Sequence, residues 1–154
     1  MTRQRTRAEV RQQPNPRTRA AHTDDMTKPT LSRWLTENVA DTRTPGGPDF
    51  RLYADPFANV WDSLLDQVHQ RRGWKLVHAD EELGLMTVIC AAPVFRFRDD
   101  LTIWVSLDEN GLTRVEARSE SRVGKGDLGV NRRRIERLLQ RLDGTAGPAV
   151  RSGR

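Results

Sequence analysis

Residues 118–142 constrain the fold more than any other stretch, because a strand end, a glycine-rich turn and an amphipathic helix follow one another directly. The apolar positions of the expected helix recur at helical spacing on one face, and arginines fall on the opposite face. Such a helix needs a second apolar surface to cover, which the rest of the chain must supply. The apolar set is Leu128, Ile135, Leu138, Leu139 and Leu142, and the basic set is Arg133, Arg137 and Arg141.

Two polar residues stand out at the start of this helix. Asp127 is a suitable N-cap, since its carboxylate can accept hydrogen bonds from the free N–H groups of the first turn. Asn131 falls among the leucines, and a buried amide needs hydrogen-bond partners. Ser119 and Ser121 point to one face of the preceding strand, close to where Asn131 should lie. We therefore predict a small polar cluster of these three residues at the edge of the core.

The turn itself matches a nucleotide-binding pattern by chance. Residues 124–129 read GKGDLG, but a dinucleotide site also needs a parallel strand after the helix and an acidic residue about 20 positions on. Only a short tail with glycine and proline follows Leu142, so we expect no nucleotide and no cofactor. A weaker alternative stays open. Free N–H groups at the helix start, with Arg122 and Lys125 nearby, can hold a small anion, although Asp127 competes for the same donors.

The middle of the chain has the pattern of a helix followed by an antiparallel meander. A short strand is expected at residues 50–54, and Asp55-Pro56 marks the start of a helix that ends at Arg71. Four strands follow at residues 74–79, 84–92, 95–107 and 112–122, and Asn110-Gly111 indicates a hairpin between the last two. The predicted fold is α+β: a two-layer sandwich of a four- to five-stranded antiparallel sheet with two helices on one face.

The other face of this sheet is expected to carry charges of both signs around Trp104. It is either a solvated face with cross-strand pairs such as Asp100 with Arg118, or a binding surface centred on Trp104. The alternation of the strands assigns the following residues to it: Arg98, Asp100, Thr102, Trp104, Glu116, Arg118, Glu120 and Arg122.

Composition divides the chain into one domain and two tails. Only 36% of the residues are hydrophobic, and the shortfall lies at the ends. Residues 1–47 are predicted to be a disordered basic tail and linker with a possible short helix at 31–39, residues 48–143 a single domain, and residues 144–154 a disordered tail. The net charge of +5 permits weak, non-specific nucleic-acid binding through the first tail. A start at Met26 is an alternative that the sequence leaves open.

Several classes of site and location are excluded by residue content. The lone Cys90 allows no disulfide and no cysteine-based zinc site within one chain, and the three histidines lack metal-ligand spacing. No metal site is therefore expected. No run of about 20 apolar residues is present, so we expect a cytoplasmic protein without membrane insertion.

The domain resembles the domain-of-unknown-function 1499 family, and the resemblance is most specific in its second half. The resemblance covers about residues 49–142 and rests on FRFRDD at 95–100, VEARSESRVG at 115–124, DLGVNR at 127–132 and Ile135. It implies a small α+β domain of bacteria and plastid-bearing organisms with no established reaction. Many members also carry a Pro-Asn-Cys-Val-Ser-like stretch upstream, of which Pro14-Asn15-Pro16 is an echo without the cysteine. The family's polar signature maps here onto Asp99, Asp100, Arg118, Ser119, Ser121, Arg122, Asp127 and Asn131.

The leading functional hypothesis is a non-enzymatic binding or protein-interaction module, because no nucleophile–base pair is apparent. The alternative is an enzyme or small-anion site built from Asp99, Asp100, Arg118, Ser119, Arg122 and Asn131. Adjacent strand residues point to opposite faces, which argues against Asp99 and Asp100 acting on one substrate. The third hypothesis is the weak nucleic-acid binding noted above. The candidate binding residues are Asp100, Trp104, Arg118, Ser119, Ser121, Arg122, Lys125, Asp127 and Asn131.

Overall fold

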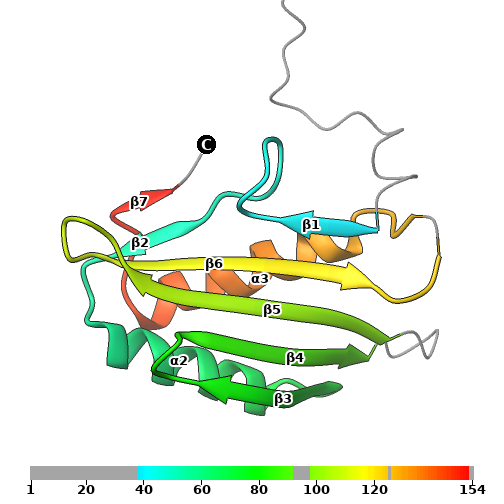
Figure 1. Cartoon of the computed structure of the whole chain (residues 1–154), viewed down its shortest axis with the longest axis horizontal. Coiled ribbons are helices and arrows are strands. Elements are labelled where there is room, and N and C mark those ends of the chain that lie inside the picture. The colour runs from blue at the N-terminus through cyan, green and yellow to red at the C-terminus, as the bar shows by residue number, and fades with distance from the viewer. Residues whose placement is uncertain (1–37, 92–97, 125, 153–154) are drawn as a thin grey trace, which may run out of the picture.

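The computed structural model of the chain describes residues 38–91, 98–124 and 126–152. It is α+β, as predicted, with two helices packed on one antiparallel sheet (Figure 1). The helices of these ranges are α2 (Phe57–Gln70) and α3 (Val130–Thr145). The strands are β1 (Val39–Asp41), β2 (Arg51–Tyr53), β3 (Trp74–Asp80), β4 (Leu85–Ala91), β5 (Arg98–Leu107), β6 (Thr113–Ser121) and β7 (Arg151–Ser152). None of the helices in these ranges is long and apolar enough to span a membrane.

The four strands β3, β4, β5 and β6 form the predicted antiparallel meander. The hairpin between β5 and β6 closes at Asp108, whose carboxylate accepts the N–H groups of Asn110 at 2.9 Å and Leu112 at 2.8 Å. Gly111 has a φ of 75°, which favours glycine. The turn between β3 and β4 also needs a glycine, because a Cβ on Gly84 would lie 1.9 Å from the carbonyl oxygen of Val105.

Within the described ranges the sheet contains seven strands, more than the four or five predicted. Two short strands, β1 and β2, pair one after the other along the outer edge of β6, and β7 pairs with β2. The segments predicted as linker and C-terminal tail therefore supply β1 and β7, and Val39 is in a strand instead of the helix proposed at 31–39. Residues 31–37 lie outside the described ranges. With three and two residues, β1 and β7 carry too little alternation to be recognised in a sequence.

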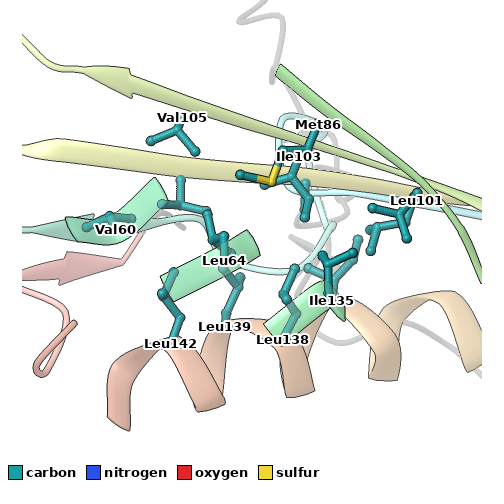
Figure 2. Close-up of a cluster of buried hydrophobic side chains, with 14 of the residues drawn as sticks. Val60, Leu64, Met86, Leu101, Ile103, Val105, Ile135, Leu138, Leu139 and Leu142 are labelled. Atoms are coloured by element: carbon teal, nitrogen blue, oxygen red, sulfur yellow. The ribbon is translucent and has the colours of Figure 1, made fainter. Parts of the chain in front are cut away.

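The core lies between the sheet and the two helices (Figure 2). From α2 it takes Val60, Trp61, Leu64 and Val68. The inward side chains of the sheet are supplied mainly by three strands: Met86, Val88 and Cys90 of β4, Leu101, Ile103 and Val105 of β5, and Val115 and Ala117 of β6.

The start of α3 differs from the prediction. The helix begins at Val130, two residues later than expected, and its N-cap is Gly129 with a φ of 75°. Leu128 has a φ of 53° and is 62% exposed, so it does not belong to the buried face. The remaining predicted positions of that face, Ile135, Leu138, Leu139 and Leu142, are all fully buried and point towards the sheet in Figure 2.

Candidate functional site

The predicted polar cluster around Asn131 is present on the side of the sheet that the helices cover. The Asn131 side chain is fully buried, and its Oδ1 accepts a hydrogen bond from the Ser119 hydroxyl at 2.7 Å. Its Nδ2 donates to the Ser121 hydroxyl oxygen at 3.0 Å and to the Asn38 carbonyl at 2.8 Å. Asn131 therefore joins α3 to β6 and to the residue that precedes β1. We call this set, with Asp99 and Arg134, the Asn131 network.

Asp99 and Arg134 complete the network as a buried ion pair. The exposed fraction of Asp99 is 3% and that of Arg134 is 9%. Arg134 Nη2 donates to Asp99 Oδ2, and Arg134 Nη1 donates to Asn131 Oδ1 and to the Ser119 hydroxyl at 2.7 Å. Because each member has partners inside the fold, these polar groups can remain buried without a ligand.

Asp127 binds the start of α3, as predicted, although the N-cap itself is Gly129. Its carboxylate accepts the N–H of Gly129 at 2.8 Å and the N–H of Asn131 at 2.6 Å. Two donors of the first turn are thus already satisfied, which weakens the hypothesis of an anion at this helix start. Lys125, which was named for the same hypothesis, lies outside the described residues.

Arg118 and Arg122 lie on the opposite side of the sheet, but their partners differ from the prediction. Asp100 pairs with Arg122, whose Nη2 lies 2.7 Å from Asp100 Oδ1 and whose Nε lies 2.9 Å from Oδ2. Arg118 instead pairs with Glu120 at 2.8 Å. The strand register explains the difference, since Arg118 lies opposite Thr102 and Asp100 lies opposite Glu120. The predicted pair of Asp100 with Arg118 is therefore wrong.

Trp104 lies on the same side and is covered by a residue of the segment after β1. The guanidinium carbon of Arg43 lies 3.6 Å from the centre of the Trp104 ring, a cation–π contact. Asp41 holds that guanidinium through bonds of 3.0 Å to Nε and 2.9 Å to Nη2. Burial acts to raise the pKa of Asp41, but hydrogen bonds from Arg43 and the charges of Arg43 and Arg118 outweigh it and lower the pKa.

The sheet face that bears Trp104 is not covered by a helix. Both helices lie behind the sheet in Figure 1, and the opposite face of β4, β5 and β6 is turned to the viewer. We call this the outer face. It combines half-buried apolar and threonine side chains with ion-paired acids and bases: Asp41, Thr87, Ile89, Asp100, Thr102, Trp104, Glu116, Arg118, Glu120 and Arg122.

The candidate residues therefore fall into two groups that the sheet separates. Ser119, Ser121, Asn131 and Asp99 lie on the helix side. The second group, on the outer face, is Asp100, Trp104, Arg118 and Arg122. The sequence-based expectation that Asp99 and Asp100 point to opposite faces is confirmed. In the described ranges, no group of three or more His, Cys, Asp or Glu side chains is arranged to hold a metal ion.

Two contacts were missed by sequence reasoning: the ion pair of Arg134 with Asp99, and the contact of Arg43 with Trp104. Arg134 is three residues after Asn131, so its angle on the helix already placed it near the buried stripe. Asp99 alternates with Leu101 and so had to point inward. Nothing in the sequence pattern could have placed Arg43 on Trp104, since that contact depends on a three-residue strand and the turn after it.

The comparison with protein families gives a match over most of the chain. The family described as "Protein of unknown function (DUF1499)" matches residues 11–142, which is most of the chain. The match begins upstream of the resemblance expected at residues 49–142, so it includes β1 and Asn38. A search of the curated proteins finds no match.

Proposed function

The chain belongs to the DUF1499 family of proteins of unknown function, and we propose that it is a protein-interaction module that catalyses no reaction and binds through its outer face. The observation that carries this proposal is the division of the polar residues by the sheet. The residues of the Asn131 network satisfy one another inside the fold. Except for the buried Asp41, the polar residues of the outer face are half-buried or exposed, and they lie near the Trp104 ring, which Arg43 contacts.

The charges of the outer face favour a protein partner. Asp41 pairs with Arg43 after β1, and on β6 Glu116 pairs with Arg114 and Glu120 with Arg118. These carboxylates repel the phosphates of nucleic acid and of anionic lipid. A protein surface can instead offer charges of both signs and an apolar contact for Trp104. Tryptophan is among the residue types that most often carry the binding energy of protein interfaces.

The alternative of an enzyme or small-ligand site fits the geometry less well. Its proposed members include Asp99 and Asn131, which are buried, and Asp100 and Arg122, which pair with each other on the outer face. One small substrate cannot contact both groups, because the sheet lies between them. An enzyme or small-ligand site would therefore have to be made either from the helix-side residues or from the outer-face residues alone.

The proposal is tested by site-specific photo-crosslinking in cells of the native source. A crosslinking amino acid at Thr102 on the outer face is compared with one at Asp62, an exposed position of α2. We expect one protein to be captured at Thr102 and not at Asp62. The captured protein is then purified and titrated with the wild-type chain and with the variants Trp104→Ala, Arg118→Glu and Asp62→Ala.

The affinities decide the outcome. Loss of about tenfold or more in Trp104→Ala and Arg118→Glu, with Asp62→Ala unchanged, supports the outer face as the interface. Equal capture at both positions, or equal affinities for all variants, contradicts it. Mass spectrometry of small molecules retained by the chain, with Arg118→Ala as control, tests the alternative, because a molecule lost only from that variant favours a ligand site.

A further inference from the structure

On the helix side, the C-terminal end of α2 lies against the middle of α3. The side-chain amide of Gln67 reaches the α3 backbone, and in the amide orientation that satisfies both groups its nitrogen donates to the Leu138 carbonyl at 3.3 Å and its oxygen accepts from the Leu142 N–H at 3.2 Å. Arg71, one turn after Gln67, is the C-cap residue of α2. The end of α2 therefore brings a guanidinium to the arginine-bearing side of α3.

Three arginines of α3 share that side. Arg134, Arg137 and Arg141 follow one another at i, i+3 and i+7, which places them in one stripe along the helix. Arg134 is already paired with Asp99, whereas Arg137 and Arg141 are exposed. Within the described ranges, no carboxylate lies in ion-pairing distance of Arg71, Arg137 or Arg141.

Among these arginines, Arg71 is the hardest to explain without a ligand. Its guanidinium carbon lies 4.4 Å from the centre of the Trp74 ring, and its Nη1 is buried with no hydrogen-bond partner among the described residues. Burial, followed by the positive charges of Arg141, Arg137 and Arg134, lowers the pKa of Arg71. An unpaired buried donor beside like charges is unfavourable, and a bound anion would remove that free-energy cost.

We infer that Arg71, Arg137 and Arg141, which we call the arginine cluster, bind the phosphate group of a small anion, with Arg71 Nη1 as the innermost donor. Guanidinium groups match phosphate oxygens through paired N–H donors, and the double charge of a phosphate suits several arginines better than a carboxylate does. The cluster lies on the opposite side of the sheet from the outer face, so the inference goes beyond the proposed function and does not depend on it.

Calorimetric titration of the full chain with inorganic phosphate, at constant ionic strength in chloride buffer, tests the inference. We expect saturable binding that Arg71→Gln and Arg141→Gln each weaken by about tenfold or more. The matched control is Arg133→Gln, which removes the same charge from an exposed position elsewhere on α3 and should change the affinity less than about twofold.

A second measurement covers the case in which Arg71→Gln fails to fold. Phosphate should raise the thermal midpoint of the wild-type chain, because a ligand that binds only the folded state stabilises it. The same addition should leave the midpoint of Arg141→Gln, a change at an exposed position, nearly unmoved. Arg133→Gln should respond as the wild type does.

Vesicles that contain phosphatidic acid separate two sources of the phosphate group. Binding of vesicles that is lost in Arg141→Gln and not competed by inorganic phosphate indicates a lipid headgroup, whereas tight binding of inorganic phosphate alone indicates a soluble anion. No saturable binding of either probe overturns the inference. Equal losses in Arg133→Gln and Arg141→Gln also overturn it, because they reveal only general attraction to a basic helix.

Discussion

The guanidinium of Arg134 on α3 and the carboxylate of Asp99 on β5 form an ion pair that is buried between the helix and the sheet. The same guanidinium also donates to Ser119 and Asn131, so one side chain connects the ion pair to the rest of the Asn131 network. The buried residues of the family's polar signature, which are Asp99, Ser119 and Asn131, thus hold α3 against the strands.

Breaking this ion pair on one side should be far more harmful than replacing both partners. Arg134→Met leaves the Asp99 carboxylate buried and unpaired, and we expect a loss of about 3–5 kcal/mol in the free energy of unfolding. The double variant Arg134→Met with Asp99→Leu should lose clearly less. Urea unfolding measures both, and Arg133→Met, at an exposed position, should stay within about 0.5 kcal/mol of wild type. A double variant at least as unstable as Arg134→Met alone would contradict the buried pair.

The stability of the fold should depend on acid pH through Asp41. The folded pKa of Asp41 lies below its ordinary value of 3.8, because Arg43 and Arg118 outweigh the effect of burial. The ionised carboxylate therefore contributes stability that is fully present above the unfolded pKa and is lost as the pH falls through the folded pKa.

We expect Asp41→Asn to reduce the loss of unfolding free energy that the wild type shows between about pH 5 and pH 3. Arg43→Gln should reduce it too, since Arg43 supplies the main favourable contacts of the carboxylate. Denaturant unfolding at a series of pH values measures both effects. Curves that run parallel to the wild type for both variants would show that Asp41 contributes nothing to the acid sensitivity.

The sequence predicts the long elements of this fold because each carries a full period of its pattern. The four strands of the meander and the apolar faces of α2 and α3 were predictable for that reason. The short strands β1, β2 and β7 depend on pairing with partners far away in the chain. Only β2 was predicted, from the short strand expected at residues 50–54.

Within the candidate sites, burial was predictable and pairing was not. The buried amide of Asn131 and its serine partners followed from helix angle and strand alternation. The ion pairs of the outer face depend on a register that alternation alone does not fix, so Asp100 was assigned to Arg118 when it pairs with Arg122. The cluster at Arg71 needs the packing of two helices, which no local pattern contains.

Two deletions test which part of the N-terminal segment stabilises the fold. Deleting residues 1–47 removes β1 and Thr42, whose backbone and hydroxyl both bond to Ala117. We expect the thermal midpoint to fall by more than about 10 °C, which corresponds to well over 1 kcal/mol. Deleting residues 1–37 keeps these contacts and should shift the midpoint by only a few degrees. Equal midpoints for both deletions would show that the domain begins at residue 48, as sequence composition alone indicated.

Any affinity for nucleic acid should come from the basic segment ahead of β1. Arginines are frequent in residues 1–25, whereas the outer face carries acids among its bases. Fluorescence anisotropy with random duplex DNA should show binding that weakens steeply with salt and has no sequence preference. The deletion of residues 1–37 should abolish it. Tight, selective binding that survives this deletion would assign nucleic-acid recognition to the folded domain.

Replacing Asn131 tests whether the Asn131 network is structural. Leucine has a similar volume but cannot accept from Ser119 or donate to Ser121 and Asn38, and each buried group left unsatisfied costs about 1–3 kcal/mol. We therefore expect Asn131→Leu to lower the free energy of unfolding by at least about 2 kcal/mol in denaturant titration. Asn59→Leu is the matched control, because Asn59 is exposed on α2 and its side chain donates to the side chain of Asp55.

The size of the change distinguishes two roles for the turn before α3. Loss in Asn131→Leu with little change in Asn59→Leu means that the amide holds β6, β1 and the helix start together, as its full burial suggests. A loss below about 0.5 kcal/mol, the usual range for a surface position, would mean that the partners are readily satisfied by solvent. The Asn131 network would then be open in solution, and its serines and Asp99 would become accessible to a ligand.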